Sequence, residues 1–116
     1  MRIVPALLAT AVAIVGSATA KDFKAPNNPQ VEGGIIRSDV DDRGASIIAW
    51  AFNLSDKVVS VQLSCVAFDA KDRPLAEQTV FIFRLASQDK GYREARLNTR
   101  ERPDYADCRM VKAEDG

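Results

Sequence analysis

The sequence contains no histidine, and this absence argues against several kinds of site. Histidine titrates near neutral pH, so it is the most frequent general base in enzymes and a frequent ligand of transition metals. A serine nucleophile would therefore have no histidine to activate it. Methionine is also scarce, with 2 residues including the initiator, so a methionine-rich copper site is not expected. We predict a protein that is not an enzyme and that binds no metal or cofactor.

The chain also lacks an excess of charge of either sign, because 16 basic residues balance 16 acidic ones. A neutral chain creates no overall field toward nucleic acid or an anionic membrane, so neither is an expected partner. The hydrophobic content of 47% and the charged content of 28% are typical of a globular protein, and a length of 116 residues predicts one domain.

Long hydrophobic runs are absent except near the N-terminus. There Arg2 precedes an apolar run over residues 6–15, and the small residues Ala18, Thr19 and Ala20 follow. This order is typical of a secretory signal peptide. We interpret residues 1–20 as a signal peptide cleaved after Ala20, with an uncleaved anchor helix as the alternative. The mature protein is then expected to be periplasmic or secreted, without stable insertion in a membrane.

Only two cysteines are present, Cys65 and Cys108. Each lies on the apolar side of an alternating stretch, VVSVQLSCVAF and YADCRMV. Thiols pair in the oxidising compartment that an exported protein enters, and an even count leaves none over. We predict a buried disulfide between two strands that are distant in sequence. Free buried thiols, an intermolecular bridge and a redox-active pair are the alternatives, although a redox pair usually has C-x-x-C spacing.

Turn residues divide most of the chain into short alternating segments, which predict β-strands. Residues 21–30 are polar and contain two prolines, so we expect a flexible N-terminal arm there. The expected strands cover 31–38, 45–54, 58–68, 75–85, 92–99 and 104–111, with a short helix as the alternative for 92–99. This pattern predicts an immunoglobulin-like antiparallel β-sandwich of about six to seven strands over residues 31–112, with a tail at 113–116. We expect Trp50 in its core, on one side of a strand with Ile48, Phe52 and Leu54.

A central part of the chain resembles a known family. Asn53-Leu54-Ser55-Asp56 follows one strand, Val59, Val61 and Leu63 alternate along the next, and Phe68-Asp69 ends it, with Leu85 where a later loop begins. This order resembles the FxLYD-type domains, small β-sandwiches of the bacterial envelope, over roughly residues 47–97. The resemblance implies a binding or structural module with no catalytic residues to transfer.

Five residues near the C-terminus form a candidate partner-binding surface: Arg93, Arg96, Arg100, Arg102 and Tyr105. Arginine and tyrosine are enriched in the energetically dominant positions of protein interfaces. Acidic residues alternate with the arginines, so an ordinary charged face is the alternative.

Three other patterns are better explained as turns. Asp39, Asp41 and Gly44 resemble the start of a calcium loop, but Arg43 and Trp50 stand where further ligands are required. Asp69 and Asp72 flank a turn, which explains paired carboxylates without acid–base chemistry. Asn53-Leu54-Ser55 fits a glycosylation sequon, although a turn role suffices.

These observations favour an exported, non-enzymatic β-sandwich that binds another protein or supports an envelope assembly. The alternative is a small secreted inhibitor or effector that acts on a target enzyme through its loops. The candidate loops are residues 39–44, 69–74 and 86–91.

Overall fold

A computed structural model describes residues 22–116 of the protein. The predicted signal peptide and its cleavage site lie outside the described residues.

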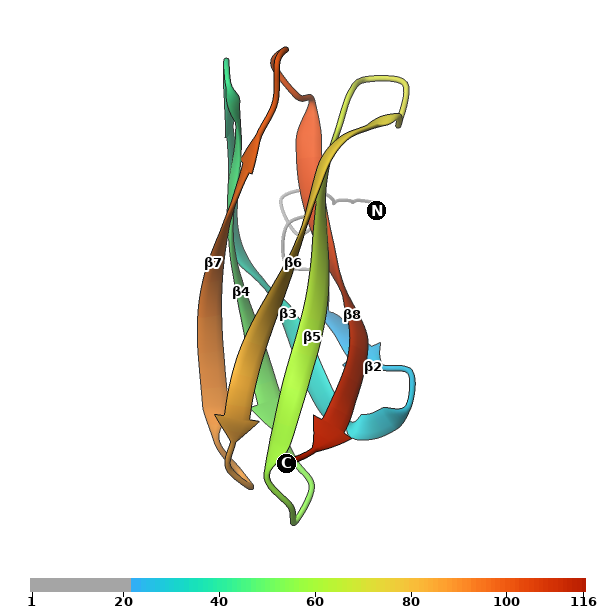
Figure 1. Ribbon diagram of the computed structural model, residues 1–116, viewed down its shortest axis with the longest axis vertical. Coiled ribbons are helices and arrows are strands. Elements are labelled where there is room, and N and C mark those ends of the chain that lie inside the picture. The colour runs from blue at the N-terminus through green and yellow to red at the C-terminus, as the bar shows by residue number, and fades with distance from the viewer. Residues whose placement is uncertain (1–21) are drawn as a thin grey trace, which may run out of the picture.

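The described residues form seven β-strands in two antiparallel sheets that pack against each other (Figure 1). The strands are β2 (Asp22–Ala25), β3 (Asn28–Asp41), β4 (Gly44–Asn53), β5 (Val59–Phe68), β6 (Pro74–Leu85), β7 (Lys90–Asn98) and β8 (Tyr105–Asp115). The first sheet has the order β2-β3-β4-β7, and the second sheet has the order β6-β5-β8. The predicted all-β sandwich is confirmed, and β7 is a strand, not the alternative helix.

The core lies between the two sheets. Strand β5 is central in the second sheet, and one parity of its residues is fully buried: Val59, Val61, Leu63, Cys65 and Ala67. Strand β4 of the first sheet faces them with Ala45, Ile47, Ala49 and Ala51. Removal of this apolar surface from water is the main force that holds the sheets together.

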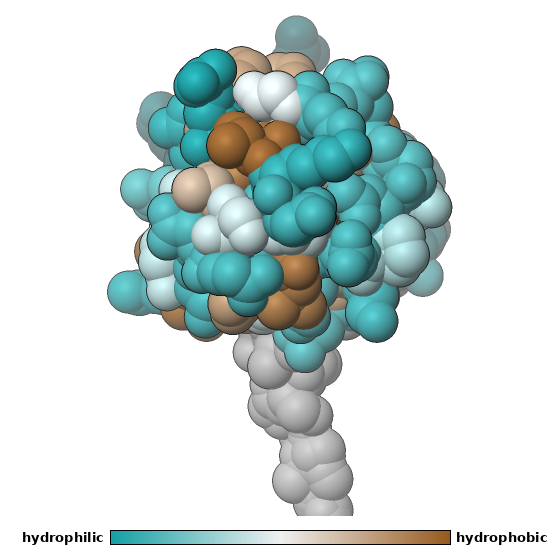
Figure 2. Space-filling view, turned by 90° about the horizontal axis from the view of Figure 1, so that it is seen from below, coloured by the Kyte–Doolittle hydropathy of each residue, from teal (hydrophilic) through white to brown (hydrophobic). Residues whose placement is uncertain are grey.

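The surface of the sandwich is mostly polar at the end where β4 connects to β5 and β6 connects to β7. Figure 2 looks onto this end and shows a mainly hydrophilic surface in which hydrophobic residues form small separate groups. The buried apolar side chains are concentrated between the sheets.

The predicted core position of Trp50 is corrected by the structure. Both parities of β4 are apolar, and the small residues face the core while Ile48, Trp50 and Phe52 face outward and are half-buried. Along-chain alternation cannot distinguish the two faces of such a strand, because neither face is polar.

Strands β2 and β3 replace the flexible arm expected at residues 21–30, from Asp22 onward. Pro26 and Asn27 form the turn between these strands, and Pro29 precedes Val31, the first residue of β3 that pairs with β4. Neither proline therefore interrupts a ladder. The Asn27 side chain exchanges two hydrogen bonds with the backbone of Ala113, at 2.8 and 2.9 Å. These bonds hold the β2–β3 turn against β8.

Strand β8 also extends further than expected. It continues to Asp115, and Ala113 is buried, so most of the expected tail at residues 113–116 belongs to the sandwich.

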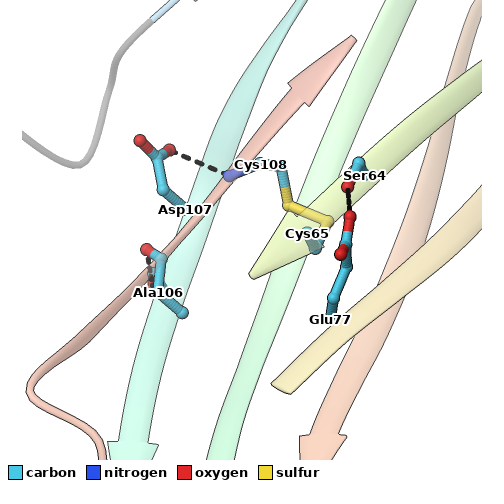
Figure 3. The surroundings of a disulfide bond; sticks show 7 residues. Ser64, Cys65, Glu77, Ala106, Asp107 and Cys108 are labelled. Carbon is cyan, nitrogen blue, oxygen red and sulfur yellow. Dashed lines mark hydrogen bonds between the residues drawn. A yellow bond between two sulfur atoms is a disulfide. The ribbon is translucent and has the colours of Figure 1, made fainter. Parts of the chain in front are cut away.

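The predicted disulfide is confirmed between Cys65 and Cys108, with an S–S distance of 2.02 Å (Figure 3). The two residues are direct partners in the β5–β8 ladder, so the bridge joins neighbouring strands of the second sheet. Both side chains face the core, as their alternating patterns predicted. The disulfide indicates an oxidising, extracytoplasmic compartment.

Candidate functional site

The outer face of the first sheet carries large apolar side chains that no other layer of the described chain covers. The strand register places Trp50 of β4 directly opposite Tyr92 of β7, and Phe52 opposite Lys90. We call this surface the aromatic face, and it consists of Ile48, Trp50, Phe52 and Tyr92. The sequence pattern did not indicate this face, because β4 alternates alanine with bulky residues and the bulky residues were expected in the core.

Two neighbours hold the indole of Trp50 in place. A Cβ atom on Gly34 would lie 2.7 Å from Nε1 of Trp50, so the indole packs directly over this glycine. The Lys90 ammonium lies 4.8 Å from the centroid of the indole and 6.0 Å from that of the Phe52 ring. Such cation–π contacts fix the lysine and the rings together. Tyr92 beside them is 56% exposed.

The five residues predicted as a partner surface lie on three elements of the chain: β7, the connection after it, and β8. Arg93 reaches from β7 to β6, where its Nε donates to the carbonyl of Phe81 at 2.8 Å. Arg100 and Arg102 lie in the connection between β7 and β8, and Arg102 pairs with Asp42 at 2.9 Å.

The other two predicted residues lie on opposite sheets. Arg96 is in β7 of the first sheet, whereas Tyr105 begins β8 of the second sheet. The β3–β4 hairpin nevertheless brings Arg96 and Arg102 close together, because they bind its adjacent residues Asp41 and Asp42, each at 2.9 Å. A role for these five residues in partner binding stays a prediction.

Tyr105 fixes the start of β8 to the turn between β5 and β6. Its ring stacks on Phe68 with centroids 4.9 Å apart, and its hydroxyl donates to Asp72 at 2.8 Å. This hydrogen bond is the main cause that raises the pKa of Tyr105. In the same turn, Asp69 accepts hydrogen bonds from the backbone N–H groups of Lys71 and Arg73. The two aspartates therefore have the turn role that the sequence predicted.

Asp41 lies at the end of the β3–β4 hairpin and binds Arg96 through both carboxylate oxygens, at 2.9 and 3.1 Å. It also accepts the backbone N–H of Arg43 at 2.8 Å. Hydrogen bonding to Arg96 is the largest cause that lowers the pKa of Asp41 from 3.8 to about 2. Bidentate pairing of this kind fixes the hairpin to β7.

We expect the Asp41–Arg96 pair to make the stability of the fold depend on pH in the acidic range. Because the pKa of Asp41 is lower in the folded state, its stabilising effect is present above pH 3.8 and is lost as the pH falls toward about 2. Asp41→Asn should therefore reduce the slope of unfolding free energy against pH in this window. Denaturant unfolding at a series of acidic pH values measures the slope. Asp56→Asn, which removes the same charge from the exposed turn between β4 and β5, is the control, and equal slopes for the two variants would contradict the expectation.

In the hairpin that resembles a calcium loop, arginine side chains already bind the aspartate carboxylates. Asp39 accepts from Arg37 at 2.6 Å, and Asp41 is bound as described. Within residues 22–116, no group of three or more cysteine, aspartate or glutamate side chains is placed to hold a metal ion. The same part of the chain contains no helix long and apolar enough to cross a membrane.

The sequon residue Asn53 is fully buried and joins the two sheets. Its Nδ2 donates to the carbonyls of Lys57, at 2.6 Å, and of Leu85 in β6, at 3.0 Å. Its Oδ1 accepts from the backbone N–H of Ser55 at 3.0 Å and from the Ser55 hydroxyl at 2.6 Å. Both donors and both acceptor sites of the amide are used, so the predicted turn role describes this residue.

Comparison of the chain with family models, with curated proteins and with solved structures finds no match.

Proposed function

We propose that this protein is an exported, non-enzymatic module that binds another protein through its aromatic face. The observation that carries the proposal is the orientation of strand β4, whose alanines face the core while Ile48, Trp50 and Phe52 face outward. An outer sheet face without a partner is usually polar, because it contacts water. Large apolar side chains at such a position are typical of an interaction surface.

The chemistry of this surface supports a protein partner. Tryptophan and tyrosine dominate the binding energy of many interfaces, and ordered side chains lose little conformational entropy on binding. Trp50 is held by Gly34 and Lys90 before any partner arrives. The Lys90 ammonium, which lies beside the indole, offers a cation to an acidic or carbonyl group of the partner.

The place of action follows from the disulfide and the N-terminal sequence. The disulfide supports an oxidising compartment, and the predicted signal peptide supports the periplasm. The resemblance to the FxLYD-type domains also favours a binding or structural module of the envelope.

Cross-linked affinity purification of the tagged protein from the periplasmic fraction tests this proposal. We expect one dominant protein at near-equal stoichiometry, and an affinity about 30-fold weaker for Tyr92→Ala, as for an interface hot spot. Tyr92 is exposed, so this substitution should leave the fold intact, and a thermal melt checks that. The comparison variant is the double substitution Arg100→Glu and Arg102→Glu, which should bind normally.

Each other outcome has a defined meaning. Loss of binding in the arginine variant with normal binding of Tyr92→Ala would move the contact to the loop between β7 and β8. Absence of any partner above background in the purification of the wild type would contradict the proposal.

A small inhibitor is the second candidate, and one observation favours it. The turns at residues 42–43 and 69–73 lie at the same end of the sandwich as the loop at 99–104 (Figure 1). Ion pairs and turn hydrogen bonds hold them, as in Arg102–Asp42 and Arg73–Asp69. The third candidate loop, residues 86–91, is at the opposite end. If the purified partner is an enzyme, its activity is measured with the wild type and with the arginine variant. Inhibition by the wild type that the arginine variant loses would support the inhibitor function.

A further inference from the structure

A groove follows the side of the sandwich on which the edge strands β6 and β7 lie next to each other (Figure 1). Its volume of about 310 Å³ is at the lower end of the range for ligand sites. Strand β6 lines it with Thr79, Phe81 and Phe83 among others, and strand β7 lines it with Arg93 and Glu94. We call this feature the side groove.

The Arg93 side chain places a positive charge in the side groove. Its Nε donates to the carbonyl of Phe81 at 2.8 Å, so the guanidinium is held across the space between β7 and β6. The two terminal nitrogen atoms form no hydrogen bond or ion pair with residues 22–116, whereas Arg96 and Arg102 pair with aspartates. These N–H groups are therefore available to an anion, and a guanidinium matches the two oxygens of a carboxylate.

Phe81 and Phe83 form an apolar wall beside this charge. Their rings stack with centroids 5.2 Å apart, and the two residues are 38% and 64% exposed. Rings that are already ordered lose little conformational entropy when a ligand covers them. Gln78 and Thr79 add neutral hydrogen-bonding side chains to the same groove. The side groove therefore combines a cation suited to a carboxylate with an exposed apolar surface.

We propose that the side groove binds the C-terminal end of a polypeptide whose last residue is apolar. The terminal carboxylate pairs with the guanidinium of Arg93, and the last side chain covers the rings of Phe81 and Phe83. A chain end carries both groups on one residue, and capture of a terminal carboxylate is a known mode of peptide recognition. A small free acid fits less well, because the wall at Phe83 is open to solvent and sites for small ligands enclose most of the molecule.

This site is separate from the aromatic face. Arg93 lies opposite the buried Ala49 and is therefore on the inner side of β7, whereas Tyr92 is on the outer side. The inference consequently does not depend on the proposed function, and either can fail without the other.

Glu94 provides a prediction about charge at this site. Among the described residues that line the side groove it is the only acid, and it forms no ion pair with residues 22–116. Its carboxylate should repel the carboxylate of the ligand without neutralising Arg93. Glu94→Gln should therefore raise the affinity about 2- to 3-fold, as expected for an exposed charge.

Nuclear magnetic resonance titration of the isotope-labelled protein tests the proposal. The probe is the peptide N-acetyl-Gly-Ser-Gly-Phe with a free C-terminal carboxylate, and the comparison is the same peptide with a C-terminal amide. We expect saturable shifts of the Arg93 Nε–H signal and of the backbone amides of residues 78–83. The amide peptide should bind on the order of 10-fold more weakly, because it lacks the charge that pairs with the guanidinium.

Three variants assign the binding to named side chains. Arg93→Gln should weaken the acid peptide on the order of 10-fold, so that the acid and amide peptides then bind alike. Phe83→Ala should weaken both peptides about 5-fold, since it removes an exposed part of the apolar wall. Arg43→Gln removes the same charge from the exposed turn between β3 and β4, and it should bind as the wild type does. Circular dichroism confirms that each variant is folded.

Two further ligands test the chain end as the occupant. N-acetylphenylalanine and an amidated peptide with an internal aspartate should both bind more weakly than the acid peptide. If either binds as tightly, the site accepts any carboxylate and the proposed occupant is wrong. Equal binding of the acid and amide peptides by the wild type would overturn the proposal, as would absence of shifts with either peptide at millimolar concentration.

Discussion

Cys65→Ala, Cys108→Ala and the double variant should each be less stable than the wild type by about 4 kcal/mol. The bridge closes a loop with a sequence separation of 43 residues, and a closed loop of this length restricts the unfolded chain. Both single variants lose the same bridge, so the double variant should be no less stable than either by more than about 1 kcal/mol. Alanine is preferred to serine because it buries no hydroxyl group in the core.

Denaturant unfolding under reducing conditions measures the three variants without intermolecular bridges. The wild type in reductant is the matched control, and it should approach the stability of the variants. Additive losses in the double variant, with a wild type unaffected by full reduction, would contradict a stabilising bridge.

The strands and the disulfide could be predicted from the sequence because local signals determine them. Along β5, one parity is apolar and the other includes Ser60, Gln62 and Ser64, so the alternation identifies the buried face that carries Cys65. Only one pairing is possible for two cysteines. The family resemblance stays a prediction, because the strand pattern and the turns that support it are common to many sandwiches.

The inner face of β4 could not be predicted by the same reasoning. Ile47 and Ile48 are adjacent, and Ala49, Trp50, Ala51 and Phe52 continue an apolar run. Side-chain size placed the core on the side of Trp50, but the packing of two sheets selected the side of Ile47 and the alanines. That choice depends on the partners across the sandwich, which a local pattern does not contain.

Contacts between residues that are distant in sequence could not be predicted either. Asn27 reaches Ala113, and this pair makes the β2–β3 turn part of the sandwich despite two prolines. The position of β6 at a sheet edge depends on the strand order, and the sequence does not specify which strands lie at the edges. The approach of Arg96 and Arg102 to the β3–β4 hairpin is likewise a contact between segments that are distant in sequence.

The second large effect is expected at Asn53. Asn53→Leu, which is similar in volume, should lower the free energy of unfolding by about 4 kcal/mol. The substitution removes the Asn53 donor from the buried carbonyl of Leu85 and one of the two side-chain donors from the carbonyl of Lys57. It also leaves the N–H and hydroxyl of Ser55 without their acceptor on Asn53. Each buried polar group left unpaired costs about 1–3 kcal/mol, reduced by local relaxation.

Asn53→Asp separates the hydrogen bonds from the shape of the side chain. The new carboxyl group keeps an acceptor for Ser55, but as a carboxylate it cannot donate to the two carbonyls that Nδ2 binds. Burial and these carbonyls should raise its pKa in the folded state above the unfolded value of about 3.9. The loss of stability should therefore be smallest at acidic pH, where the protonated group donates one bond, and should grow as the pH rises.

Unfolding free energies of Asn53→Asp and Asn53→Leu relative to the wild type, measured from pH 4 to pH 7, test this account. The difference should increase with pH for the aspartate variant and stay constant for the leucine variant. Asn98→Asp makes the same change at an exposed position of β7 and should alter stability little. A small, pH-independent loss in Asn53→Asp would mean that water replaces the lost donors. The end of β4 would then be held to the loop after β6 by backbone bonds, such as that from the Gln88 N–H to the Asn53 carbonyl at 2.7 Å. The side-chain amide of Asn53 would not be the group that joins the sheets.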